Sequence, residues 1–397
     1  MKRFMKPYNK NKIGLDNKFH LYEKKRGRWI MEEVKDMDYR IEPELPKRMD
    51  YRIGVIGAGA IVRNCHLRAY ADIGFNAYAI TSLSFEESEK VAAQYSIPNV
   101  YLSWRELIDD EAVEILDIAI PPDKQLEVVR YAVTKTHIKG ILCQKPLAMN
   151  LEEAKEIVKL CKDAAIKLGV NSNMRYDQSI RALKTVLEKG YLGQLILATI
   201  DMRAIPHWQT FLEQYDRIEI LNMGIHHVDT FRYLFGDPEK ITAVTRHDPR
   251  TKFPHIDGIS QYTFQYADEL MATSLDDVWA WQGEGVEKDI YIKWRVEGLD
   301  GMAQGYIGWC YDERTPSKMA FTCKQFPNQW IRPEWDAVWF PDAFRGTMAQ
   351  LLRAVETDTQ PEISGEDNLH TMAVIDACYL SIKEERTVKF TEIDITL

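Results

Sequence analysis

The chain of 397 residues is predicted to combine an α/β domain, built on a doubly wound parallel sheet, with an α+β domain built on a large, mostly antiparallel open sheet. Between Tyr51 and about Asn171, short apolar runs alternate with amphipathic helical stretches, which is the pattern of parallel strands joined by crossover helices. After about Asn173, strand-like runs follow one another with few helices between them. We therefore divide the chain into an N-terminal arm (1–48), an α/β domain (49–172) and an α+β domain (173–397).

The parallel sheet is expected to begin with the first apolar run after the arm. Its buried strands are predicted at Ile53–Ile56, Ala77–Thr81, Ile115–Ile120, Gly140–Cys143 and Leu168–Asn171. Helices are predicted between them at Glu86–Tyr95, Lys124–Thr134 and Leu151–Ala165. Asn150 is a good N-cap for the last of these, because two glutamates follow in the first turn.

The second domain is expected to open with a helix at Gln178–Lys189 and a long strand at Gln194–Met202. Further strands are predicted at Ile241–Thr245, Gln261–Gln265, Ile290–Trp294, Met302–Ile307 and Met319–Cys323. Helices are predicted at Gly224–Leu234, Ala343–Thr357 and Glu366–Lys383. Such a sheet has one face for its own helices. An uncovered apolar face is costly, so we expect the other face to be buried between the subunits of a homodimer or homotetramer.

The composition is that of a soluble globular enzyme, with 45% apolar and 28% charged residues. A net charge of −9 argues against a nucleic-acid surface. No apolar run is long enough to span a bilayer, and no signal-peptide core follows the basic first residues. The six cysteines are scattered without a C-x-x-C pair, which predicts neither a zinc site nor a disulfide framework. We expect a cytoplasmic protein with no metal and no nucleic-acid or membrane partner.

The arm is basic over residues 1–30 and mainly acidic over residues 31–50, and Pro43–Pro46 is typical of an extended connector. Two interpretations stay open. The arm is either a solvated tail or a segment that docks on another subunit. The second interpretation rests on four apolar residues that are unusual in a disordered tail. These residues are Leu21, Tyr22, Trp29 and Ile30.

The first predicted strand leads into Gly57-Ala58-Gly59 and then into a helical pattern. Gly57 permits a tight turn, and Gly59 lets the backbone approach a pyrophosphate held by the free N–H groups of the helix start at Ala60 and Ile61. The third small residue of this fingerprint falls at Val62, which is larger than Gly or Ala. A Gly pair alone is weak evidence, but strand, helix and second strand follow in order. The sequence thus predicts a Rossmann-type dinucleotide site.

Three further segments stand where parallel strands end or a helix begins: Asp117–Pro122, Gln144–Ala148 and Gly224–Asp229. With Trp339–Phe344 and Gly365–Leu369 they resemble, in order and spacing, the Gfo/Idh/MocA family of nicotinamide-dependent oxidoreductases. The resemblance extends from about residue 49 to the C-terminus. It implies NAD or NADP as cofactor, no metal, and a secondary alcohol or ketone of a sugar, cyclitol or polyol as substrate. The cofactor contacts that it implies include Pro121, Pro122, Gln144 and Lys145.

Lys145 is the first catalytic candidate. Most lysines are merely exposed, but this one follows a buried strand and precedes Pro146, which fixes the backbone. An ammonium held there would hydrogen-bond the reacting oxygen and stabilise a developing alkoxide. The resemblance matches it to the lysine of the family's Glu-Lys-Pro motif. Gln144 replaces the usual Glu and removes a negative charge, so we expect a shifted lysine pKa.

His226 is the second candidate, because it matches the histidine of the family's Gly-x-His-x-x-Asp motif with Gly224 and Asp229 in place. The dipole at a helix start disfavours imidazolium, and a neutral imidazole suits a general base. The family often has an Asp four residues before this histidine, where this chain has Asn222. Asn222 can hold the ring but cannot stabilise its charge. That change permits slower chemistry, a role passed to an acid such as Asp229, or loss of activity.

The cofactor's adenosine half is expected near Ser82, at the end of the second strand. A carboxylate there would bind the ribose diol of NAD, and an Arg nearby would bind the 2′-phosphate of NADP. No carboxylate stands at position 82 and no Arg between 81 and 86, and the lack of basic residues favours NAD.

The substrate-binding candidates lie in three places. Arg175 stands in a segment at the domain junction that resembles the family's. A role as a structural bridge is an equal alternative to substrate binding. His207 and Trp208 follow the long strand and would line the floor of a sugar site. His227 and Asp229 complete the set, although His227 is turned about 100° from His226 around the helix.

The sequence as a whole predicts an NAD(P)-dependent dehydrogenase or reductase of a carbohydrate-like secondary alcohol. Lys145 would polarise the oxygen and His226 would move the proton. One alternative is redox-assisted glycoside cleavage through a transient keto-sugar with retained NAD. Another is a catalytically weak member that binds cofactor or sugar, an interpretation that Gln144 and Asn222 keep open.

Overall fold

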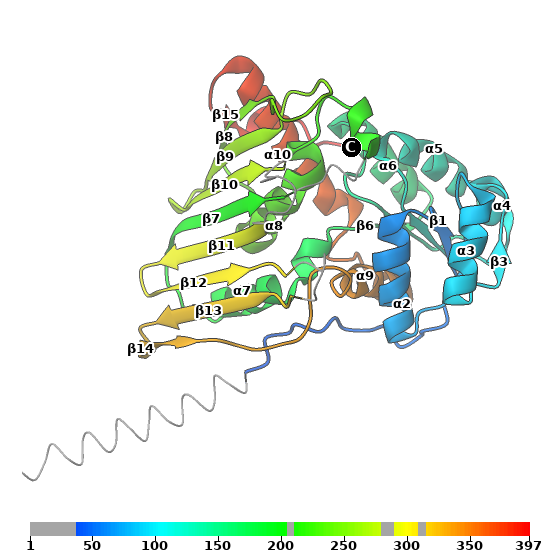
Figure 1. The fold of residues 1–397 in the computed structure, drawn as a ribbon, viewed down its shortest axis with the longest axis horizontal. Coiled ribbons are helices and arrows are strands. Elements are labelled where there is room, and N and C mark those ends of the chain that lie inside the picture. Colours follow the sequence, from blue (N-terminus) through cyan, green and yellow to red (C-terminus); the bar gives the residue numbers. More distant parts are fainter. Residues whose placement is uncertain (1–36, 205–209, 279–289, 309–314) are drawn as a thin grey trace, which may run out of the picture.

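The computed structural model describes residues 37–204, 210–278, 290–308 and 315–397. It contains a six-stranded sheet and a nine-stranded sheet, which stand side by side with helices between and around them (Figure 1). The predicted fold class is confirmed: the first sheet is parallel and the second is mostly antiparallel. The anchors proposed for the arm, Leu21, Tyr22, Trp29 and Ile30, lie outside the described residues.

The six-stranded sheet has the strand order β3-β2-β1-β4-β5-β6 and is parallel throughout. The order reverses beside β1, and ligands bind at the carboxyl ends of the strands at such a point. Strands β1, β4 and β5 are buried along their whole length, as their apolar sequences predict. The strands are β1 (Ile53–Ile56), β2 (Ala77–Thr81), β3 (Asn99–Val100), β4 (Ile115–Ile118), β5 (Gly140–Cys143) and β6 (Lys167–Val170).

The helices that connect these strands begin at the caps that the sequence provides. Asn150 Oδ1 accepts a hydrogen bond from the Glu153 amide at 2.9 Å, which confirms the predicted N-cap. Ser84 and Ser103 cap their helices in the same way. The helices are η1 (Val62–His66), α2 (Leu67–Ile73), α3 (Phe85–Tyr95), α4 (Trp104–Asp109), α5 (Pro122–Ala132) and α6 (Leu151–Asp163).

The nine-stranded sheet has the order β14-β13-β12-β11-β7-β10-β9-β8-β15. Strands β7 and β10 pair in parallel, and the other neighbours pair antiparallel. The sequence did not predict β3, α4, β10, β14 or β15. The strands are β7 (Leu195–Arg203), β8 (Lys240–Arg246), β9 (Ile259–Gln265), β10 (Met271–Asp277), β11 (Tyr291–Gly298), β12 (Gly301–Tyr306), β13 (Lys318–Cys323), β14 (Phe326–Ile331) and β15 (Val388–Lys389).

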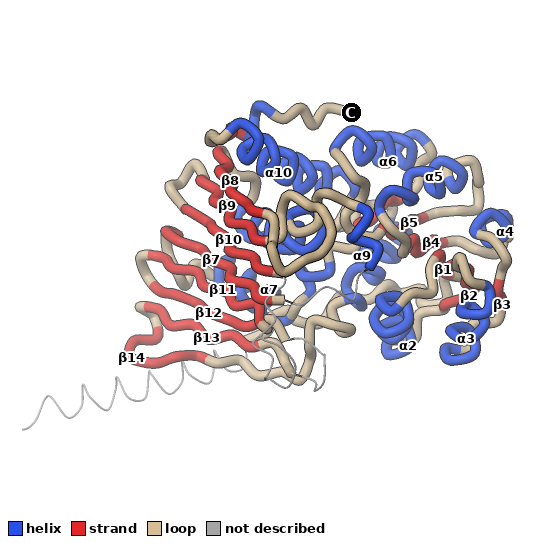
Figure 2. Tube along the Cα trace, turned by 45° about the horizontal axis from the view of Figure 1, so that its top comes forward, coloured by secondary structure: helices blue, strands red, loops and turns tan. Residues whose placement is uncertain are grey.

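Helices cover the face of the large sheet that is turned toward the parallel sheet (Figures 1 and 2). They are α7 (Gln178–Glu188), α8 (Ile225–Phe235) and α10 (Gly365–Glu384), while α9 (Phe344–Thr357) packs on β5 and β6. Four short helices complete the described chain: η2 (Asn173–Tyr176), η3 (Thr210–Gln214), η4 (Ile220–Gly224) and η5 (Phe390–Glu392). Among the described residues no helix lies on the outer face, where four apolar side chains are exposed. They are Ile196, Val244, Met271 and Leu275.

The described part of the arm lies against its own chain. The Glu356 carboxylate accepts the backbone N–H groups of Lys47 and Arg48 at 3.0 and 2.9 Å. Arg48 also forms a two-point hydrogen bond with Glu114, at the start of β4. Residues 47 and 48 therefore connect α9 to the parallel sheet.

Candidate active site

A cavity of about 350 Å³ lies where the carboxyl edge of the parallel sheet meets η4 and α8. It brings together candidates that are far apart in sequence: the glycine turn, Lys145 and His226. The parallel-sheet side is lined by Gly59, Ala60, Ile61, Val62, Ala119, Ile120, Pro121, Pro122, Gln144, Lys145 and Pro146. The other side is lined by Asn173, Ala204, Thr210, Phe211, Asn222, Met223, His226, Trp339, Phe340 and Phe344.

The glycine turn has the shape that a dinucleotide site needs. Gly57 has φ +128°, and a Cβ on it would lie 2.5 Å from the Ala119 carbonyl oxygen, so both conformation and space require glycine. Gly59 lines the cavity, and a Cβ there would meet no atom within 4 Å. The space over Gly59, at the start of a helix, fits a pyrophosphate. The residues present thus fit a dinucleotide cofactor.

Ser82 follows β2, outside the cavity lining. Its hydroxyl donates to the Ser84 carbonyl oxygen at 2.8 Å and lies 2.8 Å from the Ser88 hydroxyl. These bonds hold the loop that follows β2, and they occupy the hydroxyl that was predicted to face the ribose.

Gln144 connects the catalytic candidate to a buried polar network. Its Oε1 accepts the Lys145 amide at 2.9 Å, and its Nε2 lies 3.2 Å from His66 Nε2. His66 Nδ1 lies 2.8 Å from Asp117, and Asn171 Nδ2 lies 3.2 Å from His66 Nε2. Two donors therefore face Nε2, and a carboxylate faces Nδ1. A glutamate at 144 would place an acceptor against an acceptor, which explains why glutamine fits here.

Lys145 follows β5, and its side chain reaches across the cavity to the opposite wall. Its Nζ donates to the backbone carbonyl oxygen of Asn222 at 2.6 Å. Burial lowers the pKa of Lys145 to about 7. The amine is therefore fixed at one point and titrates near neutral pH, as a group that exchanges protons requires.

His226 is buried at the start of α8, and its ring lines the cavity. Burial, then the charges of Lys145 and His227, hold its pKa well below the usual value. The neutral imidazole was expected from a helix dipole, and that reason is wrong. The π-helix η4 leads directly into α8, and Gly224 is already helical, so the first residue of α8 is no free helix start.

Asn222 lies in η4, four residues before His226. In the described part of the chain, no hydrogen bond joins its side chain to the imidazole. Its backbone carbonyl oxygen instead accepts the Lys145 amine. The predicted hydrogen bond from the Asn222 side chain to the His226 ring is therefore not found among the described residues.

His227 is buried on the far side of α8 and does not line the cavity. Its Nδ1 lies 3.0 Å from Asp276, and the charge of that carboxyl group also acts on the buried Glu219. Burial and Asp276 raise the pKa of Glu219 well above its usual value. A Cβ on Gly224 would lie 3.0 Å from Glu219 Oε1 and 3.2 Å from the Tyr262 hydroxyl. The glycine of the Gly-x-His motif therefore leaves space for this network.

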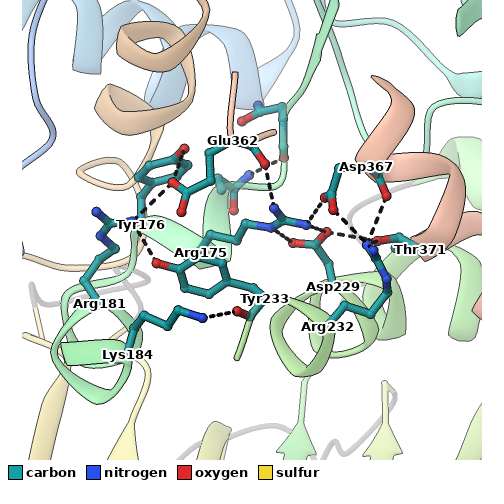
Figure 3. A network of polar contacts seen from close by, with 12 residues as sticks. Arg175, Tyr176, Arg181, Lys184, Asp229, Arg232, Tyr233, Glu362, Asp367 and Thr371 are labelled. Atoms are coloured by element: carbon teal, nitrogen blue, oxygen red, sulfur yellow. Dashed lines mark hydrogen bonds and ion pairs between the residues drawn. The ribbon is translucent and has the colours of Figure 1, made fainter. Parts of the chain in front are cut away.

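Arg175 and Asp229 form a buried ion pair away from the cavity (Figure 3). Arg175 Nε and Nη2 donate to the two carboxylate oxygens of Asp229, each at 2.7 Å. Asp367, at the start of α10, also pairs with Arg175, and Thr371 donates to Asp229 at 3.1 Å. The network joins η2, α8 and α10. This position agrees with the interpretation of Arg175 as a structural bridge.

Several lining residues had no predicted role. Asn173, Trp339, Phe340 and Phe344 stand in segments that the motif comparison selected without assigning them a contact. Phe211 and Met223 carry no sequence signal, because an apolar residue beside a cavity has the same pattern as one in a core. The predicted residues His207 and Trp208 lie outside the described residues.

Within the four described ranges there is no group of three or more His, Cys, Asp or Glu side chains arranged to hold a metal ion. The same ranges contain no helix long and apolar enough to cross a membrane.

Comparisons with known proteins agree with this geometry. The family model described as an oxidoreductase family with an NAD-binding Rossmann fold matches residues 51–172. The model of the GFO/IDH/MocA C-terminal domain matches residues 180–304.

Among curated relatives, D-apiose dehydrogenase of Paraburkholderia graminis is 26% identical over 353 residues, which cover 87% of this chain and 91% of that protein. Inositol 2-dehydrogenase of Pseudomonas fluorescens is 30% identical over 198 residues, or 48% of this chain and 56% of that protein. The crystal structure of an Agrobacterium radiobacter oxidoreductase in complex with NAD+, L-tartaric acid and magnesium has a TM-score of 0.74 at 24% identity, covering 86% of this chain and 99% of that one. This last likeness shows the fold. Because the two family models match in chain order over more than half of the sequence, the chain belongs to the Gfo/Idh/MocA family of NAD-binding oxidoreductases.

Proposed function

We propose that the protein interconverts a secondary alcohol and a ketone on an uncharged sugar, glycoside or cyclitol, with NAD in preference to NADP. The observation that carries the proposal is the convergence of Gly59, Lys145 and His226 on one cavity. Its two relatives named above are dehydrogenases of a sugar and a cyclitol.

The cofactor would be held by the glycine turn and by the ends of β4 and β5, through Gly59, Ala60, Ile61, Pro121 and Pro122. A bound nicotinamide ring accepts hydride from the alcohol carbon or returns it to the ketone carbon. Phe211, Met223 and Phe340 contribute apolar surface to the lining of the cavity.

Lys145 Nζ would hydrogen-bond the reacting oxygen and exchange its proton. The neutral amine accepts the proton during alcohol oxidation, and the ammonium returns it during ketone reduction. This assignment differs from our expectation that His226 moves the proton. The pKa of Lys145 is about 7, whereas that of His226 is well below its usual value. We assign His226 the orientation of the alcohol as a neutral imidazole.

Among the described lining residues, Lys145 and His226 are the side chains that can carry a positive charge; the pKa of His226 is held well below its usual value, and the Lys145 amine donates to Asn222. A substrate carboxylate or phosphate would find no second cation there, which supports an uncharged ring. The polar groups around it, Asn173, Thr210 and His226, suit hydroxyl groups.

The test is a screen of neutral sugars, glycosides and cyclitols, each with NAD+ and with NADP+, followed by the absorbance of the reduced nicotinamide. We expect turnover with at least one neutral polyol and a lower KM for NAD+. Turnover of a glycoside to free sugar without net reduced cofactor would instead support cleavage through a keto-sugar. Cofactor binding without turnover of any substrate would support the catalytically weak binding protein.

We also propose that the domain boundary lies near residues 172 and 173, and that the outer face of the large sheet joins two subunits. The exposed apolar residues Ile196, Val244, Met271 and Leu275 support this, because they come from the neighbouring strands β7 and β10 and from β8, which is separated from β10 by one strand.

A further inference from the structure

An aromatic residue from the far end of the chain lies against the His226 ring. Trp339 is buried, and its ring centroid is 5.0 Å from that of His226 at an interplanar angle of 86°. The Trp339 amide donates to the Gly308 carbonyl oxygen at 2.9 Å, and the Ala343 amide donates to the Trp339 carbonyl oxygen at 3.0 Å. Both ends of this residue's backbone are therefore held.

The indole is fixed by Asn173 of η2, which lines the same side of the cavity. Trp339 Nε1 donates to Asn173 Oδ1 at 2.8 Å, and Asn173 Nδ2 in turn donates to the Asn171 carbonyl oxygen at 3.3 Å. Because Asn173 binds the indole N–H, Trp339 contacts His226 through its ring atoms. The contact is an edge-to-face packing contact, which aromatic pairs favour.

The other neighbours of His226 do not hold the ring by charge. The titratable groups that act on it are Lys145 and His227, both of which disfavour imidazolium. Asp276 on β10 contacts His227 instead. In the described ranges no carboxylate pairs with His226, and the Asn222 side chain does not hydrogen-bond it.

We propose that Trp339, clamped by Asn173, is the positioning residue that holds the His226 imidazole toward the substrate. It takes the orienting role that a carboxylate at position 222 would have. The inference rests on the proposed function for its kinetic consequence only. Packing orients the ring without adding charge, so His226 stays neutral throughout the reaction and leaves the proton to Lys145.

The test compares Trp339→Leu and Trp339→Phe with a matched control, Trp294→Phe. Trp294 is equally buried and its indole N–H is also bound, to Ser179 Oγ at 3.1 Å, but it does not line the cavity. The first readout is the NMR titration of isotope-labelled histidine rings, with the His226 signals identified by their loss in His226→Asn. This readout needs no substrate, so it stays decisive even if the proposed function fails.

We expect Trp339→Leu to raise the pKa of His226 toward its ordinary value, because water then reaches the ring. We expect kcat to fall by ~10-fold or more, since small misplacements of a reacting group cost that much. The Kd for NAD(H) should stay unchanged. Trp339→Phe should recover part of the loss, and it serves as the test where the leucine variant does not fold. Trp294→Phe should lower stability without moving the His226 signals. If the Trp339 variants left the His226 signals and kcat no different from those of the Trp294 control, the positioning role would be overturned.

Discussion

The Nζ atom of Lys145 lies 2.6 Å from the backbone carbonyl oxygen of Asn222, so one hydrogen bond joins the end of β5 to η4. A carbonyl oxygen accepts from the ammonium and from the neutral amine alike. The contact therefore persists while Lys145 gains and loses its proton. The position of the amine is decoupled from its charge, which is useful for a group that works in both protonation states.

Replacing Lys145 by Met should lower kcat by ~10²–10⁴-fold, the usual contribution of a general acid or base. With a pKa of about 7, wild-type kcat/KM for alcohol oxidation should rise through neutral pH and level off above it. For ketone reduction it should fall over the same range. Both dependences should disappear in Lys145→Met, as initial rates across pH will measure. A variant that kept the wild-type pH profile would remove Lys145 from the proton transfer.

Gly59→Val should abolish NAD(H) binding while the protein stays folded, because the added side chain enters free space over the cavity. Isothermal calorimetry measures the affinity, and circular dichroism measures the fold. Gly57→Ala is the matched contrast. Its Cβ would meet the Ala119 carbonyl oxygen at a positive φ, so that variant should lose stability first. Unchanged cofactor affinity in Gly59→Val would contradict the assignment of the turn.

Asp229→Asn should destabilise the protein by about 3–5 kcal/mol, because it leaves the buried Arg175 guanidinium without its two-point partner. Urea denaturation measures the change. The control is Asp163→Asn, which breaks the exposed Lys159–Asp163 pair and should cost less than about 1 kcal/mol. Similar losses in the two variants would show that the Arg175 network does not hold α8.

Glu114 tests the docking of the arm. Although burial opposes ionisation, hydrogen bonds from Arg48 and Lys139 lower the pKa of Glu114 to about 2. A carboxylate with a lowered pKa stabilises the fold above its unfolded pKa of about 4.5 and loses that effect as the pH falls toward 2. Glu114→Gln should therefore cost on the order of 2 kcal/mol at pH 7. The difference in the free energy of unfolding between this variant and the wild type should become smaller as the pH falls from 4.5 to 2. A loss that did not vary with pH would point to packing instead of charge.

Light scattering should give the mass of a dimer or tetramer, and Leu275→Glu on the outer face of the large sheet should shift it toward the monomer. Leu102→Glu is the control, since Leu102 is also exposed but belongs to the parallel-sheet half. A monomeric wild-type protein at micromolar concentration would refute the subunit interface.

The sequence predicted the parallel sheet well, because its strands are buried on both faces and form plain apolar runs. It did not predict β10, for a physical reason. The inward positions of that strand are Ala272, Ser274 and Asp276, which are small or polar, and the last two contact His227. Hydrophobic alternation is absent where a strand's inner face binds a buried histidine.

The site was predicted in part. Motif spacing selected Lys145 and His226, which share a cavity, and it also selected Arg175, His227 and Asp229. These last three are buried in polar contacts away from the cavity: Arg175 of η2 pairs with Asp229 of α8, and His227 on the far side of α8 contacts Asp276. Trp339 lay beyond such reasoning, since its contact with His226 joins residues over a hundred positions apart.

The π-helix η4 also determines what happens when one residue is inserted or deleted before α8. A π-turn contains one residue more than an α-helix needs to cover the same path. If the deletion of one residue between Ile220 and Gly224 converted η4 to an α-helix, the path into α8 would be kept, and the change would be confined to the backbone groups of the turn itself. The Asn222 carbonyl would then leave Lys145, although no catalytic side chain had been altered. A change of one residue in length at this point would therefore alter the contacts across the cavity while the helices on either side kept their places.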